Sequence, residues 1–315
     1  MQRSWLGYAG TFFGSWDWSP YGAPVAGDDL LIANGGIAYL GYAFFGSDAV
    51  PTSIALTGDA THTAHLSVYN AVLQGVTVDN VTGVAGDYAP RIGTVTVTGW
   101  VVLDVKSGIY AAGNVPNGDA MNIDLALGST LINHGGIGAA ARDAMTIAGS
   151  SVSALENDGV INAGGGAVTI ATNVTGTGDI YAQENAITGG FVELKGAVGA
   201  GQTVHIHRGT VQVDQPQRFL APVDLPISSG YLALEHLDAT SWSVQGGLLA
   251  LFNASGGLVD TVKLTPEVAV AGVTAELQLS SFVSPTYGRG IGVTVVAVAN
   301  QNGVAPTPPT HGVIA

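Results

Sequence analysis

The sequence lacks cysteine altogether and contains few charged residues, particularly few basic ones. The absence of cysteine excludes disulfide bonds, thiolate catalysis and thiolate metal sites. Charged residues make up 10% of the 315 positions, lysine and arginine together number 9, and the formal net charge is −14 at pH 7. Such a surface repels nucleic-acid phosphates and anionic lipids, so we expect neither as a partner.

Long apolar and long helical segments are also missing. No run approaches the roughly 18–20 apolar residues of a transmembrane helix, so we expect no membrane span. The first six residues lack the continuous apolar centre of a secretory signal, so export would rely on a signal removed earlier or on another route. The best helical pattern, residues 138–145, is short and flanked by glycine.

Short strands, in contrast, are predicted throughout the chain. Hydrophobic residues make up 47% of the sequence, and the 46 glycines are about twice the usual share, which suits a fold with many turns. The predicted strands are rich in Val, Ile and Thr and are bounded by Gly, Asn or Asp. They include residues 94–98, 168–170, 191–194, 203–207 and 210–213.

One internal repeat favours a solenoid over a sandwich or barrel. Three pairs of residues recur 24 positions apart: Asn133 and Asn157, Gly135 and Gly159, and Ile137 and Ile161. A period of this size fits one coil of a parallel β-solenoid, in which each side chain stacks on its counterpart in the next coil. We expect the asparagines to form a hydrogen-bonded ladder and the glycines to supply the backbone angles of the corners.

The segment from Leu155 to Leu264 resembles the repeat regions of large bacterial secreted and surface proteins, of the autotransporter-passenger or haemagglutinin-like adhesin type. The resemblance rests on LENDGVINAGGGAVTI (155–170), VTGTGDI (174–180), VELKGAVGAGQTVHI (192–206) and GTVQVDQPQRF (209–219). Residues 241–264 look like the module that follows such repeats, and Trp16-Asp17-Trp18 with residues 27–32 looks like their opening segment. The resemblance covers about half of the chain and implies an architecture rather than an activity.

These observations predict an all-β protein built around a parallel β-solenoid. We expect an aromatic-rich N-terminal cap at residues 1–49, the solenoid at 50–225, a C-terminal cap of antiparallel β-hairpins at 226–300 and a proline-rich tail at 301–315. The antiparallel part is predicted because strands lengthen there and are joined by glycine-rich turns, and because an open solenoid edge invites aggregation.

Two candidate metal sites are weak on sequence grounds. His205 and His207 share one face of a predicted strand, but a metal ion needs a third and a fourth ligand, and the sequence nominates none. We therefore favour a solvated face with Arg208 beside it. Asp28 and Asp29 follow a turn, but no ordered series of acidic residues accompanies them, so we favour a turn that enters a strand over a calcium site.

Candidate catalytic residues are equally few. Glu235, His236 and Asp238 could form an acid–base group, but sequence alone does not show whether carboxyl groups converge in space. The glycine runs at 135–136 and 164–166 lack the lysine and the helix of a phosphate loop, so we interpret them as solenoid corners. We predict no catalytic, cofactor-binding or metal-ligating residue and no cofactor.

Aromatic residues gather near the N-terminus, where they could stack on sugar rings. We favour a hydrophobic plug over the first coil. The residues are Trp5, Tyr8, Phe12, Phe13, Trp16, Trp18 and Tyr21.

The sequence as a whole indicates a non-catalytic structural or adhesive module, extracellular or on a bacterial cell surface, with carbohydrate or other surface proteins as its partners. A polysaccharide-acting lyase or glycoside hydrolase on the same β-helix scaffold is the main alternative, because a fold does not fix a function. A structural subunit of a fibre, layer or phage appendage is a further alternative.

Overall fold

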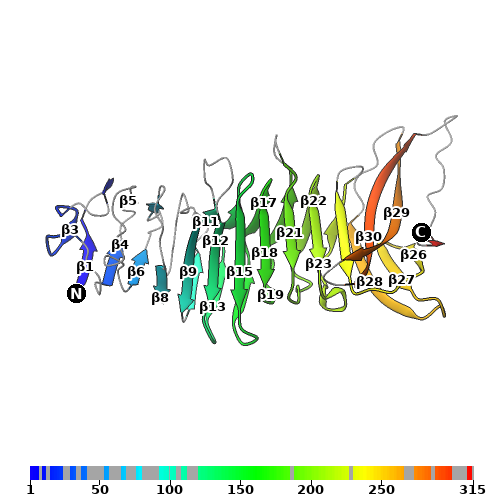
Figure 1. Cartoon of the computed structure of the whole chain (residues 1–315), viewed down its shortest axis with the longest axis horizontal. Coiled ribbons are helices and arrows are strands. Elements are labelled where there is room, and N and C mark those ends of the chain that lie inside the picture. The colour runs from blue at the N-terminus through cyan, green and yellow to red at the C-terminus, as the bar shows by residue number, and fades with distance from the viewer. Residues whose placement is uncertain are drawn as a thin grey trace.

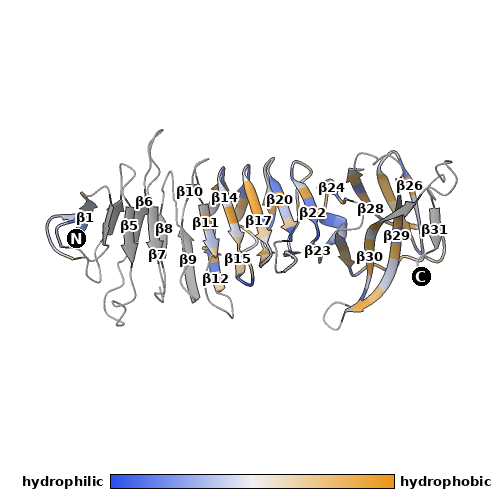
Figure 2. Ribbon diagram, turned by 90° about the horizontal axis from the view of Figure 1, so that it is seen from above, coloured by the Kyte–Doolittle hydropathy of each residue, from blue (hydrophilic) through white to orange (hydrophobic). Residues whose placement is uncertain are grey.

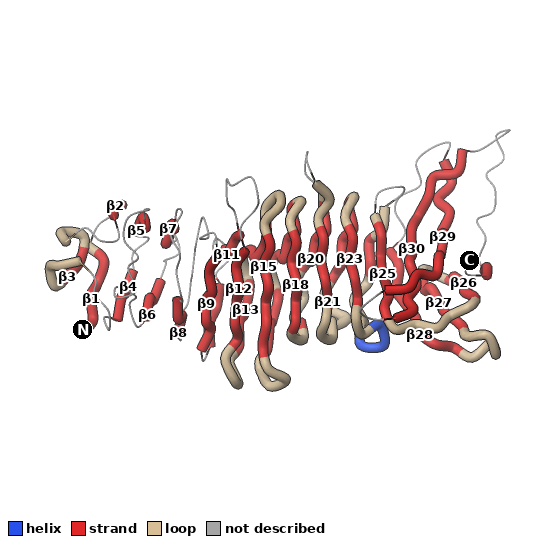
Figure 3. The backbone as a smooth tube through the Cα atoms, viewed as in Figure 1, coloured by secondary structure: helices blue, strands red, loops and turns tan. Residues whose placement is uncertain are grey.

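The chain forms an elongated all-β structure with its two termini at opposite ends (Figure 1). The computed structural model describes residues 1–6, 9–11, 15–23, 29–32, 37–40, 53–56, 65–68, 76–79, 92–98, 100–103, 108–111, 120–184, 188–226, 230–265, 273–284, 288–299 and 311–313. Within these residues the helical structure consists of one short 3₁₀ turn, η1 (Pro216–Arg218), drawn in blue in Figure 3. The predicted all-β class is confirmed.

The central part is a parallel β-solenoid, as predicted. Between residues 92 and 183 each coil contributes one strand to each of three sheets. The first sheet contains β8 (Val76–Asp79), β9 (Ile92–Thr98), β12 (Ala120–Leu125), β15 (Ala144–Gly149), β18 (Ala167–Ala171), β21 (Phe191–Leu194), β23 (Thr210–Val213) and β25 (Tyr231–Glu235). The second contains β10 (Trp100–Leu103), β13 (Thr130–Asn133), β16 (Ala154–Asn157) and β19 (Val174–Thr175). The third contains β11 (Gly108–Ala111), β14 (Gly136–Ala139), β17 (Val160–Gly164), β20 (Asp179–Gln183), β22 (Thr203–His207) and β24 (Val223–Asp224). Among the described residues, the coils that follow residue 183 contribute strands to the first and third sheets and continue the second only through single bridges at Val198 and Phe219.

Parallel pairing also reaches the N-terminal residues. The strands there are β1 (Gln2–Trp5), β2 (Ala9–Thr11), β3 (Trp18–Ser19), β4 (Asp29–Ile32), β5 (Ile37–Leu40), β6 (Ser53–Leu56) and β7 (His65–Val68). β1, β4 and β6 form one parallel series, and β2, β5 and β7 form another. Coil-like stacking therefore begins within the region expected to be a cap, while the boundary at residue 49 stays a prediction.

Strands that pair mainly antiparallel follow the solenoid. They are β26 (Ser241–Gln245), β27 (Leu248–Phe252), β28 (Leu258–Thr265), β29 (Val273–Ser284), β30 (Gly288–Ala299) and β31 (His311–Val313). Of these, β28 also pairs in parallel with β24. β29 and β30 form a long antiparallel pair, and β30 joins the end of the first sheet by pairing with β25. We still predict that these strands protect the open edge of the solenoid.

The core consists of aliphatic side chains stacked from coil to coil. In the third sheet Ile137 pairs with Ile161 and Ile161 pairs with Ile180, and all three are fully buried. The buried positions alternate with half-buried ones in strands such as β18 and β20, whereas β14 is buried along its whole length. Hydrophobic residues mark the central strands in Figure 2. Each buried aliphatic side chain contributes on the order of 1.5–3 kcal/mol, so the stacks stabilise the register of the coils.

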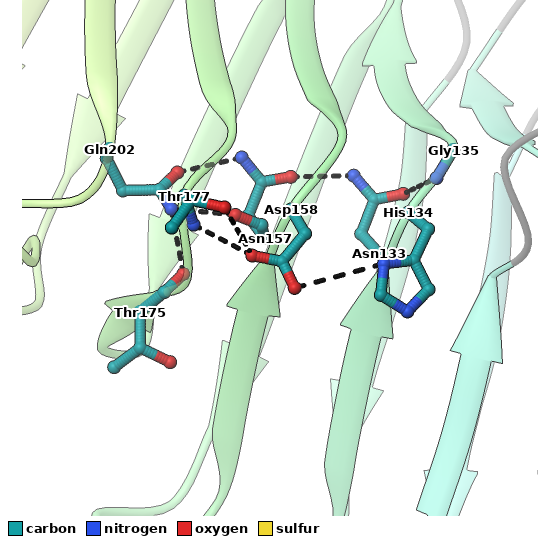
Figure 4. Close-up of polar contacts among 8 residues, drawn as sticks. All are labelled: Asn133, His134, Gly135, Asn157, Asp158, Thr175, Thr177 and Gln202. Carbon is teal, nitrogen blue, oxygen red and sulfur yellow. Dashed lines mark hydrogen bonds and ion pairs between the residues drawn. The ribbon is translucent and has the colours of Figure 1, made fainter.

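A polar ladder runs through the interior of the corner between the second and third sheets (Figure 4). The Asn133 side-chain amide donates a hydrogen bond to Asn157 Oδ1 at 2.7 Å, and the Asn157 amide donates to Gln202 Oε1 at 2.8 Å. Gln202 in turn donates to the backbone oxygens of Asn157 and Thr175. The predicted asparagine ladder is therefore present, and a glutamine extends it.

The physical reason predicted for Gly159 is wrong, although its place in a corner is right. Gly159 does not have the positive φ that we expected the corner to require. A Cβ atom built on Gly159 would lie 2.3 Å from the carbonyl oxygen of Gly135 in the preceding coil. Glycine is needed here because two backbones approach each other closely, whereas Gly165, in the next corner, does have a positive φ of 81°.

Candidate metal centre

A cluster of imidazole and carboxylate groups lies on the outer face of the third sheet. Three neighbouring strands supply it: β20, β22 and β24. Tyr181 pairs in register with His205, and His205 pairs in register with Asp224. Because alternate residues of a strand face the same side, His207 shares the outer face with His205. The solenoid thus brings together residues from three successive coils.

His205 lies between two carboxylates. Its Nε2 atom is 3.0 Å from Asp179 Oδ1, and its Nδ1 atom is 3.1 Å from Asp224 Oδ2. The same Asp224 oxygen is 3.4 Å from His207 Nε2. Asp224 Oδ2 therefore faces both imidazoles, whereas Asp179 faces the opposite nitrogen of the His205 ring.

Tyr181 fixes the plane of the His205 ring. The two rings are stacked with their centroids 4.4 Å apart and an angle of 8° between their planes. Burial raises the pKa of the Tyr181 phenol, and the negative charges of Asp179 and Asp224 raise it further. The tyrosine therefore remains a neutral, flat surface against which the imidazole packs.

The cluster is open to solvent on one side. The His205 side chain is 19% exposed and that of His207 is 48% exposed. Of the two carboxylates, Asp179 is exposed and Asp224 is half-buried. Sequence reasoning found the histidine pair but none of its partners, and the structure places Asp224 beside it as a third group that could hold a metal ion. Arg208 does not neutralise this group, because its guanidinium is directed to Glu184 at 3.5 Å.

The predicted acid–base candidates do not share one surface. Glu235 is only 2% exposed, whereas Asp238 is exposed and lies 3.2 Å from Arg289. Burial raises the pKa of Glu235, the negative charge of Asp214 raises it further, and one of its carboxylate oxygens has no hydrogen-bond partner. These three observations describe a carboxyl group closed off from solvent.

A carboxylate network that the sequence did not nominate lies beside Glu235 on the first sheet. The Gln212 amide donates to Asp214 Oδ1 at 3.0 Å and to Glu193 Oε1 at 3.5 Å. Lys195 pairs with Glu193 at 3.2 Å, and Thr169 donates a hydrogen bond to the same carboxylate. Thr169 and Gln212 reach Glu193 from the two neighbouring coils, so the network connects one coil to the next, whereas the contacts of Gln212 with Asp214 and of Lys195 with Glu193 lie within one coil.

The N-terminal aromatic residues divide into a buried pair and an exposed pair. Trp5 and Trp18 are buried and meet edge to face with centroids 5.0 Å apart. Trp16 and Tyr21 are exposed and meet at 5.8 Å. The other three aromatics, Tyr8, Phe12 and Phe13, lie outside the described residues, as do Asp28 and the side chain of Asp29.

Comparison with known proteins does not assign the chain to a family. No protein-family model matches it, and no curated protein matches it. In the part of the chain that the structure describes, no helix is long and apolar enough to cross a membrane. The fold and the geometry of the side chains are therefore the basis on which we infer a function.

Proposed function

We propose that the chain is a non-catalytic structural or adhesive module of a bacterial secreted or cell-surface protein. The observation that carries this proposal is the continuous stacking of coils, in which aliphatic stacks and the Asn133–Asn157–Gln202 ladder hold successive coils in register. Such a body is stiff along its length. Its acidic surface, with a net charge of −14, favours solubility and disfavours nucleic acid as a partner.

The exposed aromatic pair supports the adhesive part of the proposal. Trp16 and Tyr21 present large rings to solvent on either side of β3 in the sequence, and β3 lies at the N-terminal end of the structure (Figure 1). Aromatic rings combine apolar area with polar groups, which suits them to stacking on the apolar faces of sugars. We propose carbohydrate as the ligand of this pair.

Catalysis on polysaccharides is the second candidate, and one observation favours it: Glu235 has a raised pKa and lies near other carboxylates. A glycoside hydrolase needs such a carboxyl as a general acid, together with a second carboxyl that reaches the substrate. Glu235 and Asp214 are both buried in the solenoid, so neither carboxyl is presented to a polymer. We therefore favour binding over turnover.

The test measures binding and turnover on the same polysaccharides. The full chain is incubated with acidic and neutral polysaccharides, with and without Ca²⁺, and both retention and release of new chain ends are measured. We expect retention without turnover, and we expect the double variant Trp16→Ala/Tyr21→Ala to weaken retention by about tenfold. Leu127→Ala, which removes an exposed apolar side chain in another coil, is the matched control and is expected to bind normally.

The proposal would be contradicted if the wild-type chain cleaves a polysaccharide and if Glu235→Gln or Asp214→Asn abolishes this cleavage. That result would promote the enzyme hypothesis and would identify the buried carboxylates as the catalytic pair. Retention that the aromatic double variant leaves unchanged would remove Trp16 and Tyr21 from the proposed binding surface.

A further inference from the structure

We propose that His205, His207 and Asp224 bind a divalent transition-metal ion of the zinc class, with Asp179 as the residue that orients His205. The site goes beyond the structural and adhesive role proposed above and does not depend on it. It also revises the expectation, drawn from sequence, that the histidine pair is a plain solvated face.

The spacing of the three ligand atoms fits a small tetrahedral ion. Two ligand atoms that each lie about 2.0–2.1 Å from a tetrahedral ion are about 3.3 Å from each other. Asp224 Oδ2 lies 3.1 Å from His205 Nδ1 and 3.4 Å from His207 Nε2. All three ligand atoms lie within 4.8 Å of one another. Small side-chain adjustments therefore suffice to bring the two histidine nitrogens to the same separation from each other.

The contacts of His205 call for a cation. A neutral imidazole carries one N–H group and can donate to only one acceptor. Both of its nitrogens nevertheless face a carboxylate oxygen, at 3.0 and 3.1 Å. If Asp179 accepts the proton of Nε2, the lone pair of Nδ1 faces a lone pair of Asp224, and a metal ion between them removes this repulsion.

Asp179 also matches what a metal-binding histidine normally requires. A ligating imidazole usually donates its other N–H to a carboxylate, which fixes the tautomer and the ring orientation. Asp179 occupies that position, and Tyr181 holds the ring plane from the other side. His205 is thus preset to offer Nδ1 to the ion.

The ligand types select the class of metal. Calcium takes six to eight oxygen ligands, whereas imidazole suits zinc, copper, iron and nickel. The three protein ligands leave a fourth position for water, on the side where His207 is exposed. The backbone spacing is fixed, because β22 and β24 are neighbours in the same ladder.

The test uses the full chain without an affinity tag, freed of metal by a chelator. Zinc is titrated by calorimetry at pH 7.5, stoichiometry is measured by elemental analysis after dialysis, and cobalt is used as a spectroscopic substitute. We expect one ion per chain and the intense visible absorption of tetrahedral Co²⁺.

The variants separate a metal centre from surface binding. Asp224→Asn and the double variant His205→Ala/His207→Ala are expected to lower zinc affinity by more than 100-fold, and Asp179→Asn by about 10–100-fold. His134→Ala is the matched control, because His134 also lies by an aspartate, Asp158, at 3.8 Å, but belongs to no group of three ligands among the described residues. We expect it to keep the wild-type affinity, and far-ultraviolet circular dichroism confirms that each variant is folded.

Two results would overturn the proposal. One is a wild-type chain that binds no more zinc than the double histidine variant. The other is a His205 ring that NMR shows to be doubly protonated at pH 7.5 in the presence of excess zinc, because the required cation would then be a proton.

Discussion

At the residue scale, glycine at the corners serves two different physical needs. Gly165 and Gly176 have positive φ values, which side chains with a Cβ atom rarely adopt. Gly159 instead leaves room for the backbone of the preceding coil, because a Cβ atom there would meet three backbone atoms of His134 and Gly135 at less than 3.0 Å. A glycine pattern in the sequence shows where corners lie but not which of these needs applies.

This distinction yields a prediction for two glycines of the same coil. Gly159→Ala is expected to destabilise the chain by about 1–3 kcal/mol, because the new methyl group forces two coils apart. Gly164→Ala is the control, since its nearest neighbour would be 3.7 Å away and its φ is not positive, and it is expected to change stability by less than about 0.5 kcal/mol. Chemical denaturation of both variants measures the difference, and equal stabilities would show that the coils separate without cost.

At the scale of the elements, coil length varies while the sheets stay in register. Ile137 and Ile161 are paired neighbours 24 residues apart, whereas Ile161 and Ile180 are paired neighbours only 19 residues apart. The ladder adapts to the shorter coil. That coil contributes no asparagine to it, and Gln202, with a longer side chain, reaches past Thr175 to Asn157.

Asn157 is therefore the residue on which the ladder depends. Asn157→Ala is expected to cost about 2–4 kcal/mol, because it leaves a buried donor on Asn133 and a buried acceptor on Gln202 without their partner. Asn122→Ala removes a half-buried amide from the outward-facing side of β12 and is expected to cost less than about 1 kcal/mol. Urea unfolding curves of the two variants provide the comparison. Similar midpoints for both would show that the ladder contributes little to stability.

At the scale of the whole molecule, stability is expected to depend on pH through the buried carboxyl of Glu235 and the half-buried carboxyl of Asp260. Burial raises the pKa of Glu235 and also that of Asp260. In the folded chain these groups keep their protons at pH values where the unfolded chain has lost them, so ionisation favours unfolding. Their contribution to stability therefore falls as the pH rises above about 4–5, where ordinary carboxyls ionise, until the folded groups ionise as well.

Glu235→Gln tests this dependence. We expect the variant to gain stability relative to the wild type as the pH is raised from 4 to 8, since an amide does not ionise. Any cost of burying the amide applies at both pH values and cancels in the difference. Asp238→Asn removes a negative charge at an exposed position and controls for the change in net charge. Thermal unfolding at both pH values measures the effect, and parallel curves for wild type and Glu235→Gln would contradict it.

The sequence by itself determined the fold class and the repeat. Stacked coils require equivalent side chains at equivalent positions, so the 24-residue recurrence of Asn133 and Ile137 is a direct record of the pairing. Where the solenoid begins stays a prediction, because N-terminal strands such as β1 and β4 are as short as the strands of the coils.

Only the tertiary structure decided which side chains form the histidine–aspartate cluster and which carboxyls are buried. Tyr181 precedes His205 by one long coil and Asp224 follows it by one short coil, so no constant spacing connects the three residues. The environment of Glu235 likewise comes from Asp214 and Glu193 in other coils, together with the exclusion of water. Register between coils of unequal length, and the burial that follows from it, exist only once the chain has folded.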